Sequence, residues 1–137
     1  MFVDTRLAWL MLIVAGGCYG FVGIVFALPT ANARVWRLAA WAVSAVIYVG
    51  HMVYERHWIR SRPLPSAVHV ALGVAIGGFV LAVGANVHAA INPVHAPYWR
   101  YWLALVAWPI ITAVPAFLVA LVAAHAFSRV WMNRLPT

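Results

Sequence analysis

Residues 67–91 read AVHVALGVAIGGFVLAVGANVHAAI and contain no Asp, Glu, Lys or Arg. At roughly 1.5 Å of rise per residue, a helix over this stretch is about 30 Å long or more, which spans the hydrocarbon core of a bilayer. A helix also satisfies every backbone polar group within one segment, as lipid requires because it offers no hydrogen bonds. The stretch therefore predicts a transmembrane helix.

Three further runs have the same character, at residues 7–28, 35–54 and 102–127. None alternates with the period of two that a barrel strand needs, so a β-barrel is excluded. The first run is too long for a signal-peptide core, and we expect it to be retained. Short, proline-containing connections favour antiparallel hairpins between neighbours. We predict an all-α integral membrane protein: one domain over 1–137, with four transmembrane helices in an up-down antiparallel bundle.

Composition supports this fold class. Of 137 residues, 66% are hydrophobic and 8% are charged, whereas soluble domains average about half and about a quarter. So small a fold has too little interior to hide that apolar surface from water. A water-soluble enzyme and a disordered chain are both excluded.

The arginines predict orientation. The net charge is +7, but the arginines lie at chain ends and loops and form no basic stripe on a soluble face. We therefore predict no nucleic-acid partner. Six arginines fall on the side of the termini and the middle loop, against three on the other side, which predicts cytoplasmic termini in a bacterial cytoplasmic membrane. The six are Arg6, Arg56, Arg60, Arg62, Arg129 and Arg134, and the three are Arg34, Arg37 and Arg100.

Aromatic residues mark the predicted membrane boundaries. Six tryptophans lie near predicted helix ends, where an amphipathic indole prefers the interface: Trp9, Trp36, Trp58, Trp99, Trp102 and Trp131. Trp41 and Trp108 lie deeper and are expected to be packing residues. Cys18 is the only cysteine, so an internal disulfide and a cysteine metal site are excluded.

Two of the predicted helices carry glycine ridges that would let another helix approach closely. The ridges are Gly16, Gly20 and Gly23 in the first helix, and Gly73, Gly77 and Gly84 in the third. Packing within the bundle is the simpler interpretation of these ridges. A face for self-association or for a partner is the alternative.

The fourth helix contains Pro109 and Pro115, which deprive the carbonyls of Leu105 and Ile111 of their amide partners. A kink is expected there, either as static shape or as a gating hinge. Thr112 lies between the two prolines and is expected to satisfy part of the loss.

Polar residues in the second helix share one face at spacings of four, three and four: Ser44, Tyr48, His51 and Glu55. His69 and His125 are expected at a similar depth in neighbouring helices. A convergent set of His51, Glu55, His69 and His125 could bind a transition metal or relay protons. The alternative is that these groups are solvated at the membrane edge, with Glu55 paired to a nearby arginine.

A second polar set, Asn86 and His88, ends the third helix, and Asn86 is expected to hydrogen-bond another helix. Paired histidines in a bundle can ligate haem. No histidine in another span matches the depth of His88, so at most one haem is predicted.

Three functions remain open. The favoured one is a non-catalytic accessory or scaffold subunit of a larger membrane assembly, with a membrane-protein partner or a homo-oligomer in the bilayer. The second is a redox protein that binds one haem or a transition metal, whose identity the residues do not specify. The third is a small homodimeric proton-coupled transporter or channel. A membrane enzyme is less favoured because no nucleophile lies beside a base in the sequence.

Overall fold

The computed structural model describes residues 5–28, 31–59, 62–92 and 97–132. The described chain is helical: α1 (Thr5–Ala27), α2 (Ala33–Tyr54), a π-helical turn η1 (Glu55–Ile59), α3 (Pro63–Ile91) and α4 (Tyr98–Met132). Four of these helices are long and apolar enough to cross a membrane. The structure therefore confirms the prediction of an all-α chain with four such helices.

The helix boundaries differ from the predicted ones by a few residues, for identifiable reasons. Helix α3 begins at Pro63, ahead of the predicted start at residue 67, because proline is well tolerated in the first turn, where no amide partner is needed. Helix α2 ends at Tyr54, as predicted, and the chain continues directly into the π-helical turn η1. Asn32 precedes α2 with φ of 55°, a left-handed conformation that asparagine tolerates.

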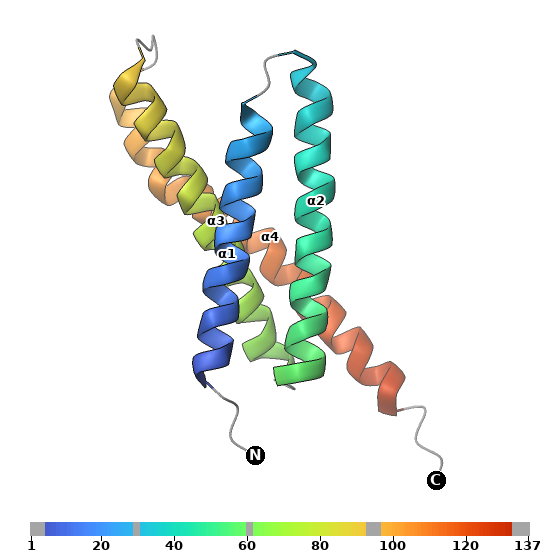
Figure 1. Cartoon of the computed structure of the whole chain (residues 1–137). Coiled ribbons are helices and arrows are strands. Elements are labelled where there is room, and N and C mark those ends of the chain that lie inside the picture. Colours follow the sequence, from blue (N-terminus) through green and yellow to red (C-terminus); the bar gives the residue numbers. More distant parts are fainter. Residues whose placement is uncertain (1–4, 29–30, 60–61, 93–96, 133–137) are drawn as a thin grey trace.

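Helix α3 is the centre of the arrangement. It packs along both α4 and α1, while α2 packs on α1 and meets α3 over only a short stretch. In Figure 1 the first turns of α1 and α3 lie at the lower end, together with the last turns of α2 and α4. A small apolar core forms between α2, α3 and α4, made of Ala67, Val70 and Ala120 with Tyr48, Met52, Phe117 and Leu121 around it.

The glycine ridges of α1 and α3 face each other. A Cβ atom at Gly16 would lie 2.6 Å from Ile76 Cγ2, and one at Gly77 would overlap Tyr19 Cβ. Real side chains do not approach so closely, so glycine at these positions is what lets the two helices pack. Gly84 is less crowded, since its nearest neighbour is Ile24 at 3.5 Å.

Helix α4 runs through Pro109 and Pro115 without a break. The Thr112 hydroxyl lies 2.8 Å from the Trp108 carbonyl oxygen and 3.2 Å from that of Pro109. We expected this hydroxyl to donate to the carbonyl groups of Leu105 or Ile111, which lose their amide partners to the prolines. That expectation was wrong, because the threonine rotamer points back one turn to other carbonyl groups of its own helix. Whether the prolines act as a hinge stays a prediction.

Two tryptophans depart from expectation. Trp41 is 80% exposed and Trp108 is also exposed, so neither is a buried packing residue within this chain. Helix α2 packs through only one side, and Trp41 lies on another face.

The structure does not describe several of the residues that predict the orientation and the membrane boundaries. Arg60 and Arg134 lie outside the described residues, as do the side chains of Trp58, Arg129 and Trp131.

Candidate functional site: a buried histidine–glutamate cluster

The most unusual group of side chains lies where the end of α2 meets the start of α3. Glu55 is 0% exposed and His51 is 6% exposed, although most of the chain's surface is apolar. The backbone N–H of Glu55 reaches the carbonyl oxygens of His51 and Met52 as α2 passes into η1. Single π-helical turns are often found at functional sites, where they alter the direction of a side chain.

Glu55 faces a histidine on the neighbouring helix. Its Oε1 lies 3.4 Å from Nδ1 of His69, whose side chain is 28% exposed. Trp9 of α1 lies against the same imidazole, with ring centroids 6.4 Å apart and planes inclined by 52°. A buried carboxylate loses several kcal/mol of hydration, so removal of the imidazole beside it would leave that group uncompensated. Three helices thus enclose one carboxyl–imidazole pair.

His51 lies one turn from Glu55 and packs against the backbone of α3 at Gly73. A Cβ atom at Gly73 would lie 3.0 Å from His51 Cε1 and 3.4 Å from its Nδ1. Neither ring nitrogen has a hydrogen-bond partner among the described residues. The two helices therefore match turn by turn, with Glu55 opposite His69 and His51 opposite Gly73.

The predicted fourth member, His125, differs from the other three. It is exposed on α4, and its Nδ1 lies 2.8 Å from the carbonyl oxygen of Leu121 on the same helix. Within the residues that the structure describes, no group of three or more His, Cys, Asp or Glu side chains is arranged to hold a metal ion. The structure therefore brings together His51, Glu55 and His69, and their predicted metal or haem ligation gains no support from this geometry.

The second polar set lies at the other end of α3. Asn86 donates through Nδ2 to the carbonyl oxygen of Tyr101 on α4 at 2.8 Å, so it makes the interhelical hydrogen bond expected of it. Its Nδ2 also lies 2.8 Å from Ala82 O in its own helix. His88 is exposed and lies beside Asn92, whose Nδ2 donates to its carbonyl oxygen at 2.9 Å.

Sequence reasoning missed three contacts of this region. Trp9 was assigned only to the interface, Gly73 only to helix packing, and Gly78 was not singled out. A Cβ atom at Gly78 would lie 2.7 Å from Thr112 Oγ1, so this glycine admits the proline-containing part of α4. His69 and Gly73 are four residues apart, as are His51 and Glu55. This equal spacing was the one signal in the sequence for the turn-by-turn match.

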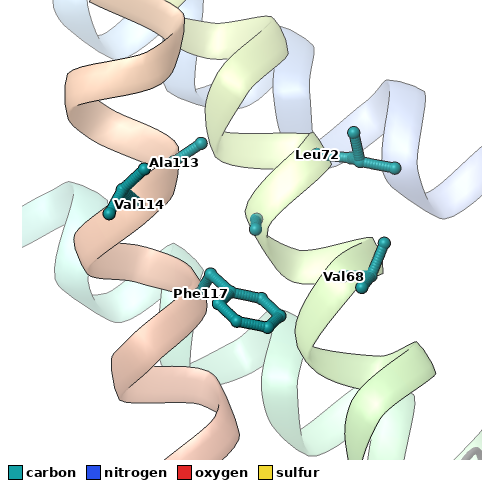
Figure 2. A pocket seen from close by; sticks show the side chains of 6 residues that line it. Val68, Leu72, Ala113, Val114 and Phe117 are labelled. Atoms are coloured by element: carbon teal, nitrogen blue, oxygen red, sulfur yellow. The ribbon is translucent and has the colours of Figure 1, made fainter.

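An apolar groove runs between α3 and α4. It is lined by Val68, Ala71, Leu72, Ala113, Val114 and Phe117. Figure 2 shows the Phe117 ring reaching from α4 toward α3, with Val68 and Leu72 on the α3 side. These lining residues are all apolar, so the groove can take an apolar side chain or an acyl chain.

The His–Glu cluster can hold or pass a proton, because a carboxyl group and two imidazoles lie within a few helical turns in a largely apolar setting. Comparisons with protein-family models, with curated proteins and with solved structures give no match for this chain.

Proposed function

We propose that the protein is an integral protein of the bacterial cytoplasmic membrane, an up-down antiparallel bundle with both termini in the cytoplasm. Large apolar side chains are exposed along all four helices, as a lipid-facing surface requires. The excess of arginine on the side of the termini supports the orientation. Alkaline phosphatase and green fluorescent protein fusions after residues 30, 61, 95 and 137 test it. A phosphatase-active fusion at residue 61 or 137 would overturn the orientation.

Within the membrane, the protein serves as a non-catalytic accessory or scaffold subunit of a larger assembly. The observation that carries this proposal is the apolar α3–α4 groove, with Ala71 and Ala113 among its lining residues (Figure 2). Helices in lipid gain little from hydrophobic burial against each other and associate through close packing at small residues. A groove with alanines in it fits one transmembrane helix of a partner protein.

Photo-crosslinking in native membranes tests this subunit role. A photoreactive amino acid at Val68 or Val114 lies in the groove, and one at Val46, exposed on α2, is the matched control. We expect one discrete protein adduct from the groove positions and none from Val46. Lipid adducts alone, or the same adduct from all three positions, would contradict the subunit role.

A second candidate function, proton transfer, is favoured by one specific observation: the wholly buried Glu55 faces the partly exposed His69. Such a pair can accept a proton from the water boundary and hold it inside the bundle. Four spans are few for a transport pathway, so a homodimer would carry it. Glu55→Gln should abolish pH-driven flux in proteoliposomes while His125→Gln on exposed α4 leaves it intact. Unchanged flux in Glu55→Gln would remove this candidate.

The haem or metal alternative stays a prediction. An absorption spectrum and metal analysis of protein purified from native membranes decide it. A featureless spectrum without stoichiometric metal would eliminate it.

A further inference from the structure

Two arginines at the start of α2 share one exposed face with two apolar side chains. Arg34, Arg37, Leu38 and Trp41 line a shallow pocket. Their spacing of three, four and seven residues from Arg34 places all four on the same side of a helix. Leu38 is exposed like Trp41, so the pocket opens away from the bundle.

Among the described residues, no acidic side chain lies near that face. The sequence contains only two acidic residues, Asp4 and Glu55. Glu55 is 21 residues after Arg34, or about 32 Å along the helix, and it is paired with His69. Asp4 lies outside the described residues.

Neither guanidinium has an ion-pair or hydrogen-bond partner within the part of the chain that the structure describes. Arg100, the third arginine at this end, is different. Its guanidinium carbon lies 5.6 Å from the centroid of the Trp99 ring, a cation–π contact within one helix. The described residues therefore supply no counter-charge for Arg34 and Arg37, which leaves both guanidinium groups open to an external anion.

We infer that Arg34 and Arg37, with Leu38 and Trp41 below them, form a binding site for an anionic phospholipid. The arginines lie in the first turns of the candidate span that begins at Ala33, and in an inserted helix of this kind the cationic end residues reach the lipid headgroups. A guanidinium binds phosphate oxygens through a planar fork of donors, and two on one face can hold one phosphate from both sides. The seven residues from Arg34 to Trp41 cover about 10 Å along the helix, the depth from a phosphate to the upper acyl chains.

The site selects lipids by headgroup charge. A headgroup that bears an ammonium, such as phosphatidylethanolamine, would bring a third cation beside two unneutralised arginines. Phosphatidylglycerol has the same phosphate without that cation. The site therefore prefers phosphatidylglycerol, and Leu38 and Trp41 contact the glycerol and acyl chains that free phosphate lacks.

Native mass spectrometry of the full chain, released from nanodiscs with matched amounts of phosphatidylglycerol and phosphatidylethanolamine, tests the site. We expect retained phosphatidylglycerol on the unmodified chain and about a tenfold lower preference in the Arg34→Gln/Arg37→Gln variant. Arg100→Gln is the matched control and should keep the preference. Trp41→Ala should weaken lipid retention, and Arg37→Lys should lose part of the preference although the charge remains.

Three outcomes would overturn the site: equal retention of the two lipids, an equal loss in Arg100→Gln, or displacement of the lipid by millimolar inorganic phosphate. The inference rests on the proposed membrane insertion. A chain that fails to enter nanodiscs contradicts insertion, whereas one that enters without lipid preference contradicts only the site. Circular dichroism of each variant should show unchanged helix content, since the substituted side chains are exposed.

Discussion

At its C-terminal end α2 leads into Glu55, a buried carboxyl that faces an imidazole of the same chain. At its N-terminal end the same helix carries Arg34 and Arg37, which are exposed and have no counter-charge among the described residues. The first end contributes to the folded state because its buried carboxyl group lies against an imidazole of α3. The second contributes little to folding and leaves its charges available to the surroundings. We therefore expect substitutions to destabilise the protein most at the contacts of Glu55 and least at Arg34.

The largest effect is expected from His69→Leu. This change leaves the buried Glu55 carboxylate without its imidazole partner, and breaking a buried pair on one side costs about 3–5 kcal/mol. The free energy of unfolding, measured in mixed detergent micelles, should fall by that order. The double variant Glu55→Leu/His69→Leu should recover most of the loss, because no buried charge remains. A double variant no more stable than His69→Leu would contradict the pairing.

A smaller loss is expected from Gly73→Ala, one turn along the same contact. The added methyl group would lie 3.0 Å from His51 Cε1, and overpacking of this kind costs about 1–3 kcal/mol. Gly50→Ala on α2 is the control, since nothing lies within 4 Å of its added Cβ atom. That control should be neutral or slightly stabilising, because alanine favours a helix over glycine. Equal losses in both variants would show that the His51–Gly73 contact is not specific.

Tyr48→Phe comes next along α2. The Tyr48 hydroxyl donates to the carbonyl oxygen of Ala116 on α4. Interhelical hydrogen bonds in membrane proteins are worth about 0.6 kcal/mol on average, and the phenyl ring keeps the packing. Unfolding of Tyr48→Phe should shift by about that amount, and a loss above about 2 kcal/mol would show that the hydroxyl does more than bridge α2 and α4.

The smallest effect on stability is expected from Arg34→Gln/Arg37→Gln. Both side chains are exposed, and substitutions at such sites usually lie within about 0.5 kcal/mol. The same variant should have the largest effect on lipid retention. A loss of stability similar to that of His69→Leu would remove the contrast between the two ends of α2.

The sequence predicted the positions of the four long helices well, because these depend on properties of single continuous runs. The length and apolarity of each run suffice to identify a helix that can cross a membrane, and all four were identified. Boundaries such as Pro63 were less accurate, because helices extend past the apolar run wherever their first turn needs no amide partner.

The site was predicted only in part, because depth follows from sequence but rotation about a helix axis does not. Depth placed His69 beside Glu55, yet it placed His125 there as well. Helix α3 is apolar on every side, so no stripe indicated that Gly73 faces His51. Helix α2 has a polar face, and its members Tyr48, His51 and Glu55 do make contacts with α3 or α4.

The central place of α3 has a consequence for biogenesis. A ribosome delivers α1 and α2 before α3, so His51 and Glu55 emerge when neither Gly73 nor His69 has been synthesised. While only α1 and α2 have been synthesised, the His51 and Glu55 side chains therefore lack the α3 contacts that they make in the folded chain. The α1–α2 packing can thus form in the order of synthesis, whereas the buried end of α2 is completed only by a later segment.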